Sequence, residues 1–174
     1  DTLRVDAKEI VESFKKHNIT SILLSGDRKE TVQAVVHELG IEDYQAELTP
    51  VQKCDYIHEL QKQNHNVLMV GDGLNDAPSL ATADVSISPA SAIDIAQNTA
   101  DIVFQGDRLG AVLKSWQISR YSNSLVKQNF MLAVIYNIFA IPIAVMGFVT
   151  PVIAAIAMSG SSLVVIGNSF RLNL

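Results

Sequence analysis

The sequence contains a single cysteine, Cys54, so no disulfide bond can form within the chain. It also lacks any long run of Lys or Arg, and its formal net charge at pH 7 is −5. A nucleic-acid partner is therefore not expected, because binding to a phosphate backbone requires a basic surface. Cys54 lies in a polar stretch with a helical pattern, and we interpret it as a partly buried thiol without a chemical role.

The longest absence is one of charge, because residues 128–170 contain no Asp, Glu, Lys, Arg or His. Within them, residues 130–148 are almost entirely apolar and would span roughly 28 Å as a helix, close to the hydrocarbon thickness of a bilayer. Thr150 and Pro151 mark a turn before a second apolar run. A buried hairpin of a soluble domain is the alternative, but a small soluble domain accommodates so long an uncharged stretch poorly. We therefore predict two transmembrane helices in lipid, at residues 129–148 and 151–170.

Basic residues flank the two apolar runs, whereas the short loop between the runs carries no charge. Lys114, Arg120 and Lys127 precede the first run, and Arg171 follows the second. Positively charged flanks remain on the cytoplasmic side of a membrane. We therefore expect a multi-pass protein of the plasma or inner membrane, with its soluble part and its carboxyl terminus in the cytoplasm.

The first part of the chain alternates between helical and strand patterns. Apolar residues recur at helical spacing in residues 6–17, 29–39 and 51–63, which predicts three helices. Pro50 opens the third of these, where its missing N–H costs little. Short apolar runs bounded by turn residues predict strands at residues 21–24, 67–70, 85–87 and 102–104. This alternation favours an α/β fold with a doubly wound parallel sheet, whose functional loops gather at the carboxyl ends of the strands.

Two carboxylates, Asp72 and Asp76, follow the strand predicted at residues 67–70. They lie in residues 71–78, which read Gly-Asp-Gly-Leu-Asn-Asp-Ala-Pro. Gly71 and Gly73 permit a tight turn between strand and loop. Carboxylates at the carboxyl end of a parallel strand are well placed to hold Mg²⁺ beside a phosphoryl group. The motif Gly-Asp-Gly alone is common in surface turns, but the full string is long enough to be specific.

This string resembles the magnesium loop of P-type ATPases, membrane cation pumps whose phosphorylation domain has the haloacid-dehalogenase (HAD) fold. Residues 24–27, Leu-Ser-Gly-Asp, resemble the Thr-Gly-Asp motif of these pumps, with Ser in place of Thr. Residues 48–53, Leu-Thr-Pro-Val-Gln-Lys, resemble the segment that carries the lysine of the fold. The motif Asp1-x-Leu-Arg4 resembles the point where the pumps re-enter the phosphorylation domain after the nucleotide-binding insertion. The motifs occur in the family's order.

The resemblance implies roles for individual residues. The Ser25 hydroxyl would bond phosphoryl oxygens, Asp27 would orient the nucleotide, and Lys53 would offset the charge of an aspartyl phosphate. ATP would be the substrate, and Mg²⁺ would be held by Asp72 and Asp76. The implied catalytic residues are Ser25, Asp27, Lys53, Asp72, Asn75 and Asp76, and the implied cofactor-binding residues are Gly26, Asp27, Gly71 and Gly73.

The family phosphorylates an aspartate in an Asp-Lys-Thr-Gly-Thr loop, and this string does not occur in the sequence. The resemblance therefore implies that the nucleophile, the nucleotide-binding and actuator domains and further membrane helices lie upstream in the same pump. We predict that residues 1–107 are the carboxyl-terminal part of the phosphorylation domain, 108–128 a connecting helix and 129–174 the helical hairpin. Alone, the chain should be inactive.

Polar residues within the predicted membrane helices indicate the transported ion. The pair Tyr136-Asn137 and the Met-x-x-Ser-Ser pattern of residues 158–162 resemble copper pumps. A thioether and neutral oxygens suit the soft Cu(I) ion, whereas Zn²⁺ or Cd²⁺ would favour a membrane carboxylate. The implied residues for the transported ion are Tyr136, Asn137, Met158 and Ser162, although packing would also explain Tyr136 and Met158.

The resemblance favours ATP-driven Cu(I) export, with a copper chaperone as a further partner. Residues 88–94, Ser-Pro-Ala-Ser-Ala-Ile-Asp, resemble the branch of copper pumps that serves respiratory oxidase assembly. Two alternatives remain at this point. A membrane-anchored HAD-type phosphatase would share Ser25, Lys53 and the magnesium loop, and a non-catalytic remnant would share the whole pattern.

Overall fold

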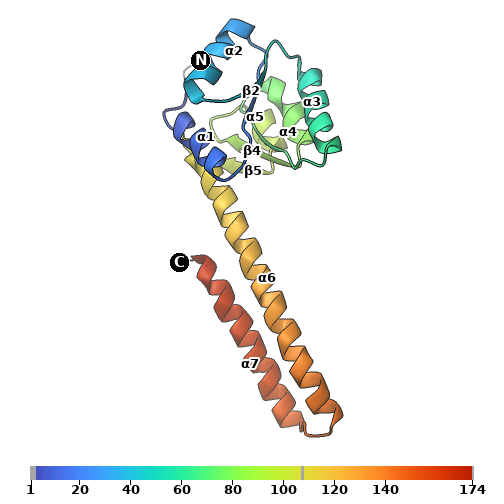
Figure 1. Cartoon of the computed structure of the whole chain (residues 1–174). Coiled ribbons are helices and arrows are strands. Elements are labelled where there is room, and N and C mark those ends of the chain that lie inside the picture. The colour runs from blue at the N-terminus through green and yellow to red at the C-terminus, as the bar shows by residue number, and fades with distance from the viewer. Residues whose placement is uncertain (1–2, 107, 174) are drawn as a thin grey trace. The chain divides into compact units, whose positions relative to one another are not determined.

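A computed structural model describes residues 3–106 and 108–173 of the chain, so Asp1 of the motif noted above lies outside the described residues. The chain divides into two units, Asp1–Leu113 and Lys114–Leu174. In Figure 1 the first unit consists of helices and short strands, and the second of two long helices that run side by side in opposite directions. Each unit is described by itself below.

The strands of the first unit form two parallel sheets. In the first sheet, β1 (Ile22–Leu24) pairs with β2 (Asp43–Gln45). The second contains β3 (Leu68–Val70), β4 (Val85–Pro89) and β5 (Ile102–Phe104) in that order. The predicted parallel α/β architecture is confirmed. Its strands lie in two sheets because β1 and β3 are not paired with each other, and β2 was not expected from the sequence.

The first three helices of this unit agree with the sequence pattern: α1 (Ala7–Lys16), α2 (Lys29–Leu39) and α3 (Pro50–Lys62). The start of α3 is fixed by reciprocal capping, in which Thr49 Oγ1 accepts from the Gln52 backbone N–H and Gln52 Oε1 accepts from the Thr49 backbone N–H. Pro50 fits the first turn because its missing N–H is not needed there. Lys53 is thereby held in the first turn of α3.

Three shorter helical elements surround the loop after β3: a 3₁₀ turn, η1 (Leu74–Asp76), and the helices α4 (Ala77–Thr82) and α5 (Asp94–Thr99). Leu80 of α4, Ala96 of α5 and Ala92 just before α5 form a buried cluster, against which Met69 of β3 packs. Leu80 and Ile57 of α3 are each only 1% exposed. The core of the unit therefore lies directly beside the predicted magnesium loop.

The carboxylate of Asp6, just before α1, caps the start of the long helix α6 (Gly110–Val145). Its Oδ1 accepts from the Leu109 N–H at 3.1 Å, and its Oδ2 accepts from the Gly110 N–H at 2.8 Å. Burial opposes ionisation of this carboxyl, but the two backbone donors, with a contribution from Arg108, outweigh it and lower the pKa of Asp6. A negative charge is also favoured at a helix amino terminus.

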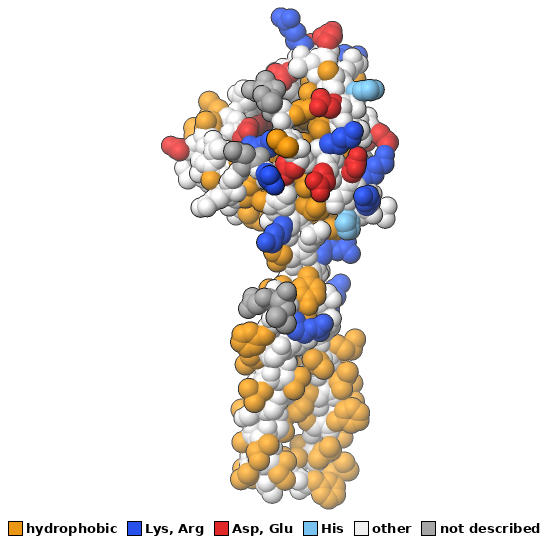
Figure 2. Space-filling model, turned by 90° about the vertical axis from the view of Figure 1, so that its left-hand side faces the viewer, with side chains coloured by type: hydrophobic (Ala, Val, Ile, Leu, Met, Phe, Trp, Pro, Cys, Tyr) orange, Lys and Arg blue, Asp and Glu red, His pale blue; other side chains and the backbone are white. Residues whose placement is uncertain are grey.

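In the second unit, α6 is followed by α7 (Pro151–Ser169) and a 3₁₀ turn, η2 (Phe170–Asn173). Gly147, at φ 78°, allows the reversal that ends α6, and Thr150 Oγ1 accepts from the Ile153 N–H to cap α7. The segments Gly110–Val145 and Pro151–Leu172 are long and apolar enough to cross a membrane. Figure 2 shows side chains of the second unit that are mostly hydrophobic, whereas acidic side chains gather on the first unit.

We predict that Asp6→Asn lowers the free energy of unfolding of the first unit by about 1 kcal/mol at pH 7, because the amide replaces one of the two accepting oxygens with a donor and one hydrogen bond is lost. Because the pKa of Asp6 is lowered in the folded protein, its charge contributes fully above the unfolded pKa, and the contribution disappears as the pH falls through the folded value. The difference between wild type and variant should therefore shrink towards zero in acid. Urea unfolding of the whole chain in detergent at several pH values would measure it.

The exposed carboxylate Glu9 of α1 provides the matched control, because Glu9→Gln makes the same change in net charge without touching α6. A difference between wild type and Asp6→Asn that stayed constant from neutral to acid pH would contradict the cap.

Candidate functional site

The loop after β3 folds back onto its own second carboxylate. The Gly71 N–H donates to the Ile87 carbonyl at 3.3 Å, and the Gly73 N–H donates to Asp76 Oδ2 at 3.4 Å. A Cβ atom added at Gly71 would lie 2.8 Å from the Cβ of Asp76, which is closer than real Cβ contacts allow. Glycine is therefore required at position 71, because the side chain of Asp76 approaches its backbone too closely for any Cβ. Asp76 is held inside the loop.

Lys53 and Asp76, two residues predicted to be catalytic, are in direct contact. Lys53 Nζ donates to Asp76 Oδ1 at 2.8 Å, and the exposed fractions of the two side chains are 9% and 20%. A buried ammonium group requires a charged or polar partner, since removal from water is costly. Asp76 is that partner, so the ion pair attaches the first turn of α3 to the magnesium loop.

Asp72, in contrast, is open to solvent, with 62% of its side chain exposed. Its Oδ2 lies 3.5 Å from Arg4 Nη2. Arg4 Nη1 is buried and makes no hydrogen bond within the described part of the chain. In the sequence, Arg4 belongs only to the motif of residues 1–4. Its contact with a carboxylate 68 residues away depends on tertiary structure, and the only signal for it in the sequence was the motif itself.

The predicted hydroxyl loop after β1 is held by its own hydrogen bonds. Ser25 Oγ donates to Asp27 Oδ2 at 3.2 Å and accepts from the Asp27 N–H at 3.1 Å. The N–H groups of Leu48 and Glu47 donate to the carbonyls of Ser25 and Asp27. A Cβ added at Gly26 would lie 3.2 Å from the Leu48 carbonyl oxygen. No hydrogen bond or ion pair among residues 3–106 and 108–173 joins Ser25 to Lys53 or Asp72.

The donor set of the magnesium loop fits Mg²⁺ in part. Mg²⁺ is usually held by one or two carboxylates together with waters and substrate phosphates. Asp72 offers an accessible carboxylate, and Asn75 of the same loop is exposed. Asp76 is bonded to Lys53 and Gly73, so it supports the loop. The residues that the structure describes contain no group of three His, Cys, Asp or Glu side chains arranged around one ion.

The four residues predicted for the transported ion lie on the helices of the second unit. Tyr136 is half-buried, whereas Asn137, Met158 and Ser162 are exposed, Met158 by 66%. The hydroxyls of Ser161 and Ser162 both donate to the Met158 carbonyl, at 2.9 and 3.0 Å. The structure therefore places Met158 and Ser162 one turn apart on α7 and leaves their side chains uncovered by the rest of this unit.

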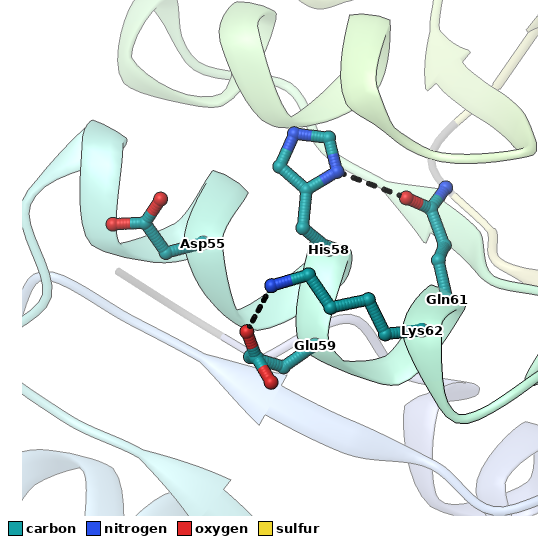
Figure 3. Close-up of a pocket in the computed structure, with 5 residues that line it drawn as sticks. All are labelled: Asp55, His58, Glu59, Gln61 and Lys62. Atoms are coloured by element: carbon teal, nitrogen blue, oxygen red, sulfur yellow. Dashed lines mark hydrogen bonds and ion pairs between the residues drawn. The ribbon is translucent and has the colours of Figure 1, made fainter.

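A pocket on α3 is separate from all of these residues. Figure 3 shows its lining side chains, which are Asp55, His58, Glu59, Gln61 and Lys62. Lys62 Nζ donates to Glu59 Oε1 at 2.6 Å, and His58 Nδ1 lies 3.1 Å from Gln61 Oε1. Four of these side chains bond in pairs on the surface of one helix, and none of the five was predicted to be functional, so the loop after β3 is the stronger candidate site.

Comparison with known proteins shows what the chain as a whole is similar to. Residues 1–84 match the family of haloacid dehalogenase-like hydrolases. The nitrogen fixation protein FixI of Rhizobium leguminosarum bv. viciae is 47% identical, over 99% of this chain and 23% of FixI. A copper-exporting P-type ATPase of Staphylococcus haemolyticus is 41% identical, over 99% of this chain and 22% of that protein. The crystal structure of a zinc-transporting PIB-type ATPase covers 99% of this chain with a TM-score of 0.93 and 28% identity.

The chain is homologous to one part of the heavy-metal P-type ATPases. It spans about a quarter of the length of these relatives, 23% of FixI and 28% of the zinc-transporting ATPase. The predicted combination of a HAD-like domain with two apolar helices is confirmed. Together with the relatives, the two membrane-length helices identify a membrane protein.

In this P-type ATPase homologue, we predict that Gly71→Ala disrupts the magnesium loop, because the added Cβ would collide with Asp76 and displace it from Lys53. Overpacking of this kind typically costs about 1–3 kcal/mol. Urea unfolding of the whole chain in detergent would measure the loss. Gly160→Ala is the matched control, since a Cβ there meets no atom within 4 Å. Equal unfolding midpoints for both variants would contradict the prediction.

Proposed function

We propose that the chain is the carboxyl-terminal part of an ATP-driven heavy-metal pump that exports Cu(I) from the cytoplasm through an aspartyl-phosphate intermediate. One observation carries the proposal. The Lys53–Asp76 ion pair lies beside the exposed Asp72 at the carboxyl end of β3, in a chain that also contains two membrane-length helices. A membrane-anchored phosphatase would use the same loop, but it has no need for Tyr136, Met158 and Ser162 within its anchor.

The residues of the site divide the work of phosphoryl transfer. Bound Mg²⁺ would neutralise charge on the transferred phosphoryl group. Asp72 provides an accessible carboxylate for it, and Asp76 keeps the loop in shape. The Lys53 ammonium, held by Asp76, would offset negative charge on the aspartyl phosphate. The Ser25 hydroxyl, which donates to Asp27 in this structure, would exchange that bond for one to a phosphoryl oxygen.

The free edges of two strands support a nucleophile that comes from upstream. β1 pairs only with β2, and β3 pairs only with β4, so each has an unpaired edge in the described sheets. Leu68 and Val70 of β3 are 38% and 37% exposed, although strands of parallel sheets are normally covered on both faces. A parallel strand between β1 and β3 would pair with both edges, and its carboxyl end would bring an aspartate to the level of Asp72.

The membrane helices supply the ligands for the transported ion in this proposal. Met158 and Ser162 lie one turn apart and are exposed on α7, so they are free to face further helices of the pump. A thioether with neutral oxygens favours Cu(I) over Zn²⁺ or Cd²⁺. The copper-exporting relative supports this ion, and the zinc-transporting neighbour makes Zn²⁺ the alternative.

Supply of copper to respiratory oxidase assembly is a narrower proposal, which rests on the Pro-Ala-x-Ala pattern of residues 89–92.

Movement of the phosphorylation domain would reach the membrane through α6, with the soluble part in the cytoplasm as the basic flanks indicate. The helix runs without a break from Gly110 to Val145, and its first turn is bonded to Asp6 of the soluble unit. A continuous helix with a fixed start transmits displacement, whereas a flexible segment would absorb it.

We predict that the full-length pump forms a phosphoenzyme from radiolabelled ATP and Mg²⁺ that depends on Cu(I), and that Asp72→Asn abolishes it because a ligand of the site is lost. Asp43→Asn, at an exposed carboxylate of β2, is the matched control and should leave it unchanged. The chain of residues 1–174 alone should form no phosphoenzyme.

Three other results would change the proposal. Stimulation by Zn²⁺ or Cd²⁺ in place of Cu(I) would keep the pump and correct the ion. Hydrolysis of p-nitrophenyl phosphate by the chain alone would favour the anchored phosphatase. A full-length protein that forms no phosphoenzyme with any of these ions would favour the non-catalytic remnant.

We also predict that a flexible glycine linker inserted after Ser119 uncouples ATP hydrolysis from transport, because it interrupts α6 between the soluble unit and the apolar segment. Vesicle uptake of Cu(I) per ATP hydrolysed should fall at least tenfold while hydrolysis continues. An Ala-rich insertion of the same length, which keeps the helix, is the control. Unchanged transport with the glycine linker would show that α6 does not carry the coupling.

A further inference from the structure

Polar side chains join α6 and α7 at the end of the hairpin away from the loop. Asn129 Nδ2 donates to Ser169 Oγ at 2.9 Å, and Asn168 Nδ2 donates to Asn129 Oδ1 at 2.9 Å. Asn129 thus uses both its donor and its acceptor across the helix pair. Asn129 and Asn168 are half-buried, so the hydrogen bond between them is partly shielded from the surroundings, whereas the bond to Ser169 is exposed. We call Asn129, Asn168 and Ser169 the asparagine clasp.

A second set of contacts surrounds the clasp on its outer side. Gln128 Oε1 accepts from Asn168 Nδ2 at 3.4 Å and from Arg171 Nη1 at 3.5 Å. Arg171 Nη1 also donates to Asn168 Oδ1 at 3.3 Å. In the described part of the chain, the side-chain hydrogen bonds between α6 and the segment from α7 onwards all lie at this end of the hairpin. Nearer the loop, the described half-buried positions 136, 140, 157, 161 and 165 form no side-chain hydrogen bond that joins the two helices.

The contacts of the asparagine clasp show which residues of the two antiparallel helices lie opposite each other. With Asn129 opposite Asn168, a step of seven residues along each helix, close to two turns, brings Tyr136 opposite Ser161. Burial agrees with this register, since the half-buried positions over this stretch are 129, 136 and 140 on α6 and 157, 161, 165 and 168 on α7. The same register sets the height of Met158 along α6, because Met158 lies on α7 three residues before Ser161.

We propose that the asparagine clasp is a positioning device that holds α7 in register with α6 and thereby sets the position of Met158 and Ser162 relative to Tyr136 and Asn137. This role rests on the proposed function of these four residues as ligands of the transported ion. In a membrane, apolar helix faces slide past each other at little cost, because lipid and side chains are equally apolar. A slip of one residue would move Met158 by about 1.5 Å along the axis and rotate it by about 100°.

The first experiment measures the register and does not depend on pumping. Cysteines are placed at Ala140 and Ala157, both half-buried facing positions, in the whole chain with Cys54→Ser, reconstituted in lipid vesicles. Disulfide formation between the two cysteines is then compared with formation between cysteines at Ala140 and Ala154. The clasp predicts that Asn129→Ala with Asn168→Ala shifts cross-linking from the first pair towards the second. Asn123→Ala, an exposed asparagine of α6, is the matched control. An unchanged cross-linking pattern in the double variant overturns the proposal.

The second experiment measures the consequence in the full-length pump. The Cu(I) concentration that half-saturates transport should rise roughly threefold for each interhelical hydrogen bond lost, and about thirtyfold in the double variant, which loses the bonds Asn129–Ser169, Asn168–Asn129 and Asn168–Gln128. Phosphorylation from inorganic phosphate in the absence of Cu(I), which does not require the transported ion to be bound, should not change. A shifted register with unchanged half-saturation would overturn the positioning role. A shifted register in a protein that transports no ion would contradict the proposed function and leave the clasp in place.

Discussion

The shape of the candidate site in the first unit depends on one constraint, the burial of the Lys53 ammonium group. Because only 9% of this side chain is exposed, it requires a negative partner, and Asp76 reaches it only when the loop after β3 folds tightly. The tight fold in turn requires Gly71, since any side chain there would occupy the position of Asp76. One ion pair therefore attaches the first turn of α3 to the loop that carries Asp72. An ion pair of this kind adds little to stability after desolvation, so its value lies in placing charge.

Periodicity and turn residues predicted the longer elements well, because each carries its own signal. α2 has an apolar stripe and ends at Gly40, and α3 begins at Pro50 with its capping residues beside it. The elements that sequence analysis missed lack such signals. β2 is a strand of three residues, Asp-Tyr-Gln, whose pairing with β1 decides its conformation. The short helices α4 and α5 exist because Leu80, Ala92 and Ala96 pack together, which is a property of the folded core.

The candidate site shows the same division between local and tertiary information. The motifs identified Ser25, Lys53, Asp72 and Asp76, and the structure adds that Lys53 and Asp76 bind each other while Asp72 remains open. The approach of Arg4 to Asp72 and of Asp6 to Gly110 could not be read from the sequence, because each joins residues far apart in the chain. In the second unit, hydrophobicity predicted both helices, but the pairing of Asn129 with Asn168 depends on the angle at which the helices face each other.

The cap formed by Asp6 joins the beginning of the first unit to its end, so that the chain of this unit forms a closed loop. The peptide backbone leads from residue 6 through every strand and helix of the unit to residue 110, and two hydrogen bonds return directly from Gly110 and Leu109 to Asp6. A pull along α6 is therefore divided between two routes, one through the backbone beside β5 and one through the carboxylate into α1. These two attachments resist twisting as well as tension. Rotation of the start of α6 about the helix axis would have to distort both the backbone and the hydrogen bonds to Asp6.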